Sequence, residues 1–322
     1  MKALIYTGPE QLEFGDRPNP SPQPDEQVIQ VASAGICGSD MHAYLGHDER
    51  RPSPLILGHE VAGVRVDDGR RVTINPLVTC GACGYCLDER DNLCPTRQII
   101  SMPPRDGGFA EFVTMPERNL VDLPEGISTD QAALAEPIAC GWHASRLALN
   151  IAKDLTIAAV IGGGAIGVGA ALSLRAQGVE SVHIFEPNYV RREFLESLGG
   201  LDVRATLDQG ERTYPIVVDA VGYEATRGDA SRIVAPGGVI AHIGLGSASG
   251  GLDIRRMTLQ EITFIGTYAY TSADFLATAH AMFDGSLGAL DWTEVRDLSD
   301  GAQAFADIRA GRVPAPKIIL KP

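Results

Sequence analysis

The chain has 322 residues, enough for two domains, because one compact core rarely extends beyond about 250 to 300 residues. Its composition, 44% hydrophobic and 21% charged, is typical of a globular protein. The net charge of −14, from 27 basic and 41 acidic residues, argues against nucleic acid or an anionic membrane as a partner, because both require a basic surface.

The N-terminal residues, MKALIYTGPE, lack the apolar stretch of a secretory signal. We therefore expect the protein in the reducing cytoplasm, where its six cysteines are not expected to form disulfides. These cysteines need another role.

The first part of the chain, to about residue 145, is rich in short strand patterns separated by proline and glycine turns. The strands predicted there are 2–6, 27–31, 60–66 and 71–74.

From residue 155 strands and helices alternate, which predicts parallel βαβ units with helices on both faces of a sheet. The predicted strands are 155–161, 181–185, 203–205, 216–221, 238–243 and 262–266, and the predicted helices are 165–177, 189–198 and 224–234. The tail adds an amphipathic helix over 274–283 and a strand over 316–320.

Residues 155–174 carry no charge and contain a GxxxG pair, so length alone would permit a membrane helix. Five glycines and the lack of a basic flank favour a buried strand that turns into a helix. Gly162, Gly164 and Gly167 lie at that turn, where they permit a tight bend, a close approach of pyrophosphate and close packing of helix on strand. The helix N-terminus then offers free N–H groups to phosphate.

Glu186 ends the next predicted strand, where a carboxylate accepts hydrogen bonds from the adenosine ribose. The same charge repels a 2′-phosphate, so the sequence favours NAD. Arg191 and Arg192 lie nearby and act in the opposite direction, which leaves NADP open. Glycines that serve only a tight turn are the alternative to a dinucleotide site.

Cys80, Cys83, Cys86 and Cys94 follow the spacing C-x2-C-x2-C-x7-C. Four thiolates so close in sequence can enclose one tetrahedral zinc ion, which predicts a structural metal site. An iron–sulfur cluster is the alternative, but ferredoxin runs end with a shorter spacing before Cys-Pro.

A second metal site is indicated by Cys37, His59, Glu60 and Glu136, which lie in distant segments. One thiolate, one imidazole and one carboxylate, with a fourth position open, make a typical catalytic zinc site. Each residue alone could be structural. Cys140 and His143 are interpreted as packing residues, and His47, His183, His242 and His280 stay unassigned.

At this point the sequence resembles the zinc-dependent medium-chain dehydrogenase/reductase superfamily, and within it the sorbitol (polyol) dehydrogenase-like branch. The resemblance rests on motifs along the whole chain: GICGSDMH, LGHEVAG, the four-cysteine loop, AEPIACGWHA, VIGGGAIGVGAA, APGGVIAHIGL and PKIILK. It implies an α/β protein with a GroES-like β-rich catalytic domain (1–145 and 271–322) and an inserted Rossmann domain with a doubly wound parallel sheet (146–270).

The resemblance also implies the chemistry: a zinc enzyme that transfers a hydride from a secondary alcohol, such as a polyol, diol or sugar alcohol, to NAD and gives a ketone. Cys37 and His59 match catalytic zinc ligands, while Glu60 and Glu136 match carboxylates that bind the metal or its water. Asp40 matches an acceptor that orients a histidine ligand.

Further matches concern the proton relay and the cofactor. Ser39 and His42 match a relay from the substrate oxygen to solvent. Ile166, Glu186 and Arg191 match cofactor contacts, as do Ile243, Gly244 and Leu245 beside the nicotinamide. The expected assembly is a homodimer or homotetramer.

Two departures bear on the substrate. The polyol branch has a tyrosine where this chain has Ala43 and an arginine where it has Ala269, although the adjacent Tyr270 agrees. We therefore expect an alcohol that is smaller or less hydroxylated than sorbitol. A zinc-free quinone or enoyl reductase of the same superfamily and a non-catalytic dinucleotide-binding protein are the alternatives.

The Rossmann part contains one expected irregularity. Only residues 206–215 separate the third predicted strand from the fourth, and in the dinucleotide fold these strands lie about 22 Å apart along the diagonal. Ten helical residues span only about 15 Å, so we expect an extended segment without a helix.

Overall fold

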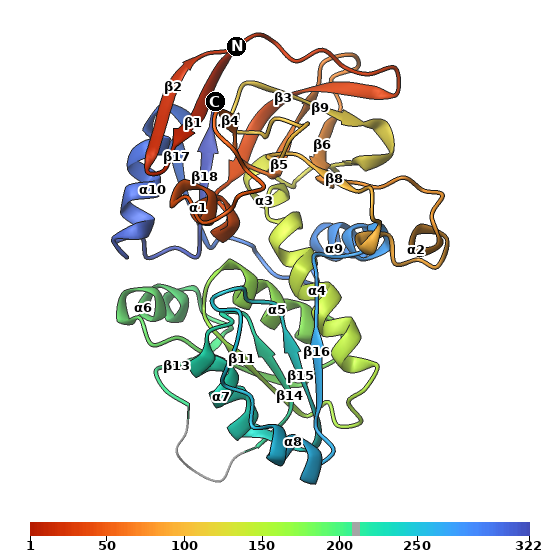
Figure 1. Cartoon of the computed structure of the whole chain (residues 1–322), viewed down its shortest axis with the longest axis vertical. Helices are drawn as coiled ribbons and strands as arrows, with labels where there is room; N and C mark the ends of the chain where they lie inside the picture. Colours follow the sequence, from red (N-terminus) through yellow and green to blue (C-terminus); the bar gives the residue numbers. More distant parts are fainter. Residues whose placement is uncertain (208–212) are drawn as a thin grey trace.

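The protein is described by a computed structural model that covers residues 1–207 and 213–322. Figure 1 shows a β-rich body that holds both termini and, below it, a body built on a sheet flanked by helices. The two main sheets, one mostly antiparallel and one fully parallel, confirm the predicted α/β fold class.

The largest sheet of the upper body has the order β10-β6-β5-β3-β18-β17, with β9 paired to β3. Its C-terminal strand β18 pairs antiparallel with β3, so that Ile319 lies opposite Gly35. The C-terminus thereby joins the body formed by the first part of the chain. The strands are β3 (Glu26–Gly35), β5 (Glu60–Arg65), β6 (Arg71–Ile74), β9 (Phe112–Pro116), β10 (Leu120–Asp122), β17 (Thr293–Asp297) and β18 (Lys317–Lys321).

Smaller elements complete this body. The remaining strands are β1 (Lys2–Gly8), β2 (Gln11–Asp16), β4 (Leu55–Ile56), β7 (Leu77–Val78) and β8 (Gln98–Ile99). Its helices and 3₁₀ turns are α1 (Gly38–Tyr44), α2 (Gly84–Leu87), η1 (Asp91–Leu93), η2 (Glu117–Asn119), α3 (Thr129–Ala132), η3 (Leu298–Asp300) and α10 (Gly301–Arg309). Strand β2 was not among the predicted strands, because its run is short and its side chains are exposed or half-buried.

The lower body is a six-stranded parallel sheet of order β13-β12-β11-β14-β15-β16, which is the Rossmann order 3-2-1-4-5-6. Its strands are β11 (Ile157–Ile161), β12 (Ser181–Phe185), β13 (Asp202–Arg204), β14 (Tyr214–Asp219), β15 (Val234–His242) and β16 (Thr263–Gly266). Its helices are α5 (Ala165–Ala176), α6 (Tyr189–Leu198), α7 (Glu224–Ile233) and α8 (Ile254–Leu259).

The turn between β11 and α5 requires glycine at two positions. Gly162 has φ +100°, a left-handed conformation that side chains rarely adopt. A Cβ on Gly167 would lie 1.8 Å from the carbonyl oxygen of Gly162, so only glycine lets α5 start this close to the strand. Residues 155–174 therefore form a strand, a turn and a helix, and no helix in the described ranges is long and apolar enough to cross a membrane.

The two bodies are joined by α4 (Ala135–Leu149) and by the segment that leads from β16 to α9 (Ser272–Phe283). Helix α4 packs closely on α5, since a Cβ on Gly141 would lie 2.4 Å from the backbone nitrogen of Ala170. The predicted domain boundary after residue 145 falls inside α4, so the division stays a proposal.

Helices α4 and α9 are connected by a buried ionic cluster around Asp274. Its carboxylate accepts from Arg146 Nε at 2.6 Å and lies 2.7 Å from His143 Nδ1. His143 is thus more than the packing residue that the sequence suggested. Burial opposes ionisation of Asp274, but the hydrogen bonds from His143, Arg146 and Thr271 hold its pKa far below the ordinary value.

We expect Asp274→Asn to lower the free energy of unfolding by about 2 kcal/mol near neutral pH, because it removes the charge of a buried carboxylate that is hydrogen-bonded to His143 and to the partly exposed Arg146. A carboxylate with a depressed pKa stabilises the fold above its ordinary pKa of about 4 and loses this effect as the pH falls towards the folded-state value. In urea denaturation, the difference in free energy of unfolding between the variant and wild type should therefore become smaller below about pH 4. Asp284→Asn, at the exposed end of α9, is the matched control. An unchanged difference across this range would contradict the assignment.

The expected extended segment over 206–215 is only partly visible. Residues 206, 207 and 213 are not helical and β14 begins at Tyr214, whereas 208–212 lie outside the described residues. The prediction for the middle of this segment stays open.

Candidate active site and metal centres

Cys37, His59 and Glu60 are brought together by the pairing of β3 with β5. Cys37 directly precedes α1, and His59 and Glu60 stand at the start of β5, where Glu60 lies opposite Gly35. One ligand atom from each of the three residues lies within 4.8 Å of the other two. Because the pairing joins segments distant in sequence, this thiol, imidazole and carboxylate converge without any local motif.

Glu60 is held in one orientation by its surroundings. Its Oε1 accepts from Lys317 Nζ at 2.5 Å, and both side chains are almost fully buried. Its Oε2 is buried and, among the described residues, has no hydrogen-bond partner. A Cβ on Gly35 would lie 2.0 Å from that oxygen, so glycine is needed there. One carboxylate oxygen thus remains available to a cation.

The imidazole ring of His59 contacts Asp40 and Ser101 through Nδ1. Nδ1 lies 3.5 Å from Asp40 Oδ1 and 3.3 Å from Ser101 Oγ. Burial alone would lower the pKa of His59, but Asp40 and Cys37 raise it well above its usual range. The same negative surroundings favour a bound metal ion, and Asp40 lies where the sequence placed the acceptor that orients a histidine ligand.

Arg51 is a buried residue of this site that sequence analysis missed. It donates to Ser39 O at 2.8 Å and to Ser101 O at 3.0 Å, and its Nη2 lies 3.4 Å from Ser39 Oγ. Ser39 therefore lies beside the metal group. His42, on the same helix α1, is exposed to solvent.

Glu136 lies near the metal group but outside it. It lies in the first turn of α4, is buried, and accepts a hydrogen bond from the hydroxyl of Tyr270 at 3.0 Å. Burial, followed by the charge of Glu60, raises the pKa of Glu136 to about 7. Of the two carboxylates considered from the sequence, the structure groups only Glu60 with Cys37 and His59.

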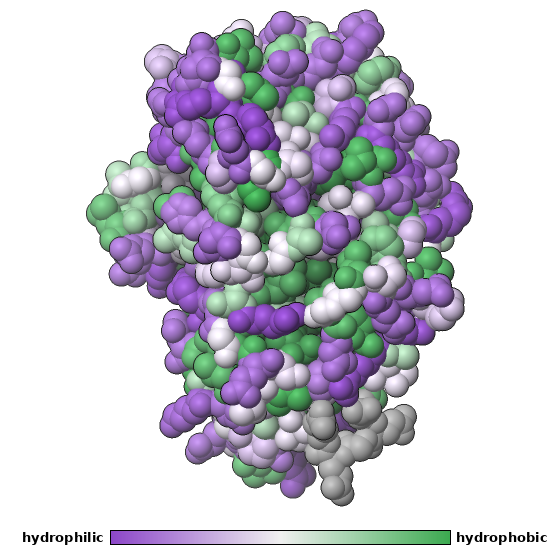
Figure 2. Space-filling model, turned by 180° about the vertical axis from the view of Figure 1, so that it is seen from behind, coloured by the Kyte–Doolittle hydropathy of each residue, from purple (hydrophilic) through white to green (hydrophobic). Residues whose placement is uncertain are grey.

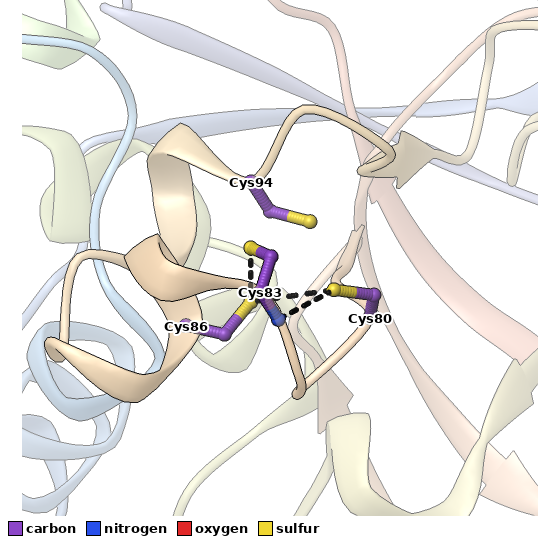
Figure 3. Close-up of side chains that lie close together, drawn as sticks. All are labelled: Cys80, Cys83, Cys86 and Cys94. Carbon is purple, nitrogen blue, oxygen red and sulfur yellow. Dashed lines mark hydrogen bonds between the residues drawn. The ribbon is translucent and has the colours of Figure 1, made fainter.

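The four cysteines of the second predicted site also converge. Their sulfur atoms lie within 4.8 Å of one another, around α2 and η1 (Figure 3). Backbone N–H groups of Ala82 and Cys83 lower the pKa of Cys80 to about 6, whereas burial raises that of Cys86 to about 11. Cys80, Cys83, Cys86 and Cys94 form no disulfide in the structure.

A cavity of about 880 Å³ extends between the two bodies from the metal group to the glycine turn. Figure 2 shows a hollow between the two halves of the molecule, with hydrophobic residues in its depth. Predicted site residues that line the cavity are Cys37, Glu60, Gly162, Gly164, Ile166, Gly167, Glu186 and Arg191.

At the dinucleotide end, Glu186 is buried and fixed by backbone donors. Its two oxygens accept from Gly163 N at 2.9 Å and from Asn188 N at 2.8 Å. Arg191 lies over the glycine turn, where its Nη1 would be 3.8 Å from a Cβ on Gly164. Its Nε is buried and, in the described part of the chain, has no hydrogen-bond partner. An anion at the N-terminus of α5 would supply one.

Ile243, Gly244 and Leu245 follow β15 but do not line the cavity. The amides of Ile243 and Gly244 both donate to Asp219 O, at 3.0 and 3.1 Å, and a Cβ on Gly244 would lie 2.1 Å from Val221. This contact holds the segment against the loop after β14. Leu245 is 77% exposed.

Zinc fits both groups of ligands. The cysteine group offers four thiolates and no free position, as structural sites do, and the Cys37 group offers three ligands and one orphaned carboxylate oxygen. With a dinucleotide fold on the other side of one cavity, fold and site define a zinc-type oxidoreductase.

Comparisons with known proteins agree with this class. Residues 23–125 match the family described as "Alcohol dehydrogenase GroES-like domain", and residues 165–284 match "Zinc-binding dehydrogenase". The chain is 30% identical to sorbitol dehydrogenase of Bacillus subtilis, with 86% of each chain covered. It is 29% identical to L-galactonate-5-dehydrogenase of Escherichia coli, covering 90% of this chain and 89% of the relative.

Among solved structures, galactitol-1-phosphate dehydrogenase from Escherichia coli is similar, with a TM-score of 0.86 at 25% identity and 100% of both chains covered. The chain belongs to the zinc-dependent medium-chain alcohol dehydrogenase superfamily, in its polyol dehydrogenase branch. It is an oxidoreductase that acts on CH–OH groups.

Proposed function

We propose that the protein oxidises a secondary hydroxyl of a polyol or sugar acid to a ketone, with NAD as the hydride acceptor. The observation that carries this proposal is the continuous cavity, which has Cys37 and Glu60 at one end and the glycine turn with Glu186 at the other. The relatives named for sorbitol, L-galactonate and galactitol-1-phosphate support a polyhydroxylated substrate.

In this proposal Cys37, His59 and Glu60 hold a catalytic zinc, and the four cysteines hold a structural one. When bound, zinc supplies Lewis-acid polarisation of the substrate hydroxyl, and NAD supplies the hydride acceptor. Asp40 and Ser101 fix the ring of His59. Tyr270 orients Glu136 beside this group.

Ser39 and His42 carry the proton away in this scheme. Arg51 can only donate, so Ser39 Oγ accepts from it and keeps one lone pair for the substrate proton. The serine O–H is then free to donate towards the exposed side of α1, where His42 meets solvent. Histidine suits this last transfer because its ordinary pKa is about 6.5.

The proposed function is tested with the purified protein, its zinc content and a substrate panel. We expect two zinc per chain and NAD reduction with polyols, diols or sugar acids that are smaller or less hydroxylated than sorbitol. Because Ala43 and Ala269 remove two large side chains expected in the polyol branch, sorbitol should not be the best substrate. Reduction of quinones or enoyl compounds by a zinc-free protein would overturn the proposal.

Cofactor choice is proposed to depend on Glu186. We expect Glu186→Gln to reduce the preference for NAD over NADP about tenfold, which corresponds to 1.4 kcal/mol, because the variant keeps one acceptor oxygen and loses the charge that repels a 2′-phosphate. The ratio of kcat/KM for the two cofactors measures the change. Glu196→Gln, on the exposed part of α6, is the control. A wild type that uses NADP as well as NAD would show that Glu186 does not select the cofactor.

The proposed assembly is a homodimer or homotetramer. Apolar side chains are strongly exposed on α8, where Leu259 is 72% and Ile254 63% exposed, and α8 leads into the edge strand β16. Sedimentation of the purified protein distinguishes these assemblies from a monomer.

A further inference from the structure

The cysteine lobe, residues 80–97, contacts the chain segment that crosses from the parallel sheet back to the upper body. This crossing segment, residues 267–271, joins β16 to α9, and Figure 1 shows α2 of the lobe next to α9. Asn92, which is buried, donates from Nδ2 to Tyr268 O at 2.8 Å. Asp91 accepts from Ser272 N at 3.1 Å.

A third contact joins the lobe to the crossing segment, again at Tyr268. The guanidinium carbon of Arg97 lies 4.7 Å from the centre of the Tyr268 ring, and Arg97 Nε donates to the tyrosine hydroxyl at 3.3 Å. The lobe is therefore fixed to the crossing segment at Tyr268 and to the first residue of α9 at Ser272, four residues further along the chain.

Between these two anchors stands Tyr270. It is 1% exposed, and its hydroxyl donates to Glu136 Oε1 at 3.0 Å. The chain bends sharply just before it, since Ala269 has φ +47°. An alanine adopts this left-handed backbone conformation only where surrounding contacts stabilise it. The lobe supplies such contacts before and after Ala269, at Tyr268 and Ser272.

We propose that Asn92 and Asp91 are positioning residues, which hold the crossing segment so that Tyr270 keeps Glu136 oriented beside Cys37, His59 and Glu60. This inference rests on the proposed function, because it assigns the lobe a part in the same active site. Asn92 stands in η1, and the amide of Cys94 donates to Asp91 O at 3.0 Å. The conformation of the four-cysteine group thereby sets where both anchors lie.

The consequence is a cysteine lobe that contributes to turnover as well as to stability. A displacement of a positioning contact by about 1 Å can cost up to a hundredfold in rate, and outer contacts of metal sites are worth about ten- to a hundredfold. A purely structural lobe would affect folding alone.

The test uses the zinc-loaded protein with Asn92→Ala and with Asn92→Asp, which keeps the shape but removes the donor. We expect kcat with the best polyol to fall about tenfold in both, with the KM for NAD and the content of two zinc per chain unchanged. Arg90→Ala, on the exposed surface of the same lobe and stacked on Tyr85, is the control and should behave as wild type.

Two further measurements separate positioning from general damage. In a Tyr270→Phe background, Asn92→Ala should lower kcat little further, because both changes remove one linkage. Amide hydrogen exchange of residues 269–271 should be faster in the Asn92 variants and unchanged in Arg90→Ala. Additive losses in the double variant, or unaltered exchange, would overturn the inference.

Failure of the proposed function has a different signature. A wild type that oxidises no polyol would remove that function, and exchange at 269–271 would then decide the positioning role by itself. Wild-type exchange in both Asn92 variants would refute it.

Discussion

His59→Ala is expected to lower kcat/KM by about a thousandfold or more and to reduce the zinc content from two per chain to one. The imidazole is one of three convergent ligands, and a Lewis-acid metal is worth several kcal/mol of transition-state stabilisation, where each 1.36 kcal/mol is tenfold in rate. Binding of NAD should change little, because the dinucleotide end of the cavity is built from other elements.

The measurement combines steady-state kinetics, metal analysis and cofactor titration. Asp40→Asn should give an intermediate loss of about ten- to a hundredfold, because it removes the acceptor beside Nδ1 and leaves the ligand in place. His280→Ala, exposed on α9, is the control. If His59→Ala kept two zinc per chain and normal turnover, this group would not be the catalytic metal site.

The glycine turn and the cysteine lobe could be predicted from the sequence because each is local. Gly162, Gly164 and Gly167 lie within six residues between a strand and a helix. The glycine turn can therefore be recognised without knowledge of the rest of the fold. The cysteine spacing determines its own geometry in the same way. Local sequence patterns were therefore enough to predict the turn between β11 and α5 and the convergence of the four cysteines.

Lys317, Arg51 and Ser101 could not be predicted, because their roles arise only when distant segments meet. Lys317 lies 257 residues from Glu60, and a lysine beside an apolar strand is ordinarily a solvent-exposed end. Its one signal was the motif PKIILK, in which a charged residue directly precedes three apolar ones. The sequence also left Glu60 and Glu136 equivalent, and only the pairing of β3 with β5 distinguishes them.

Strand β17 illustrates a second limit of prediction from the sequence. β17 has the sequence TEVRD, whose side chains are exposed or half-buried, so it lacks the apolar alternation that marks a strand. It is a strand because β18 offers it a parallel partner along its whole length. Tertiary contacts here decide a structure that the local pattern does not specify.

The second large effect is expected at Lys317. Burial would lower its pKa, but Glu60 raises it, so the lysine stays charged and pairs with the carboxylate at 2.5 Å. Lys317→Met leaves Glu60 as a buried charge without this partner, and breaking a buried pair on one side costs about 3 to 5 kcal/mol. We expect that loss in the free energy of unfolding of chelator-treated protein.

In zinc-loaded protein the loss should be smaller, because a cation at Glu60 Oε2 compensates the charge that Lys317 no longer balances. Urea denaturation with and without chelator therefore measures the loss in free energy of unfolding caused by Lys317→Met in the zinc-free and in the zinc-loaded protein. Lys321→Met, on the same strand but 39% exposed and paired with Asp130, should cost less than about 1 kcal/mol in both states. Equal losses at Lys317 with and without zinc would show that Glu60 does not face the metal, and Glu136 would then be the remaining carboxylate to supply the third ligand.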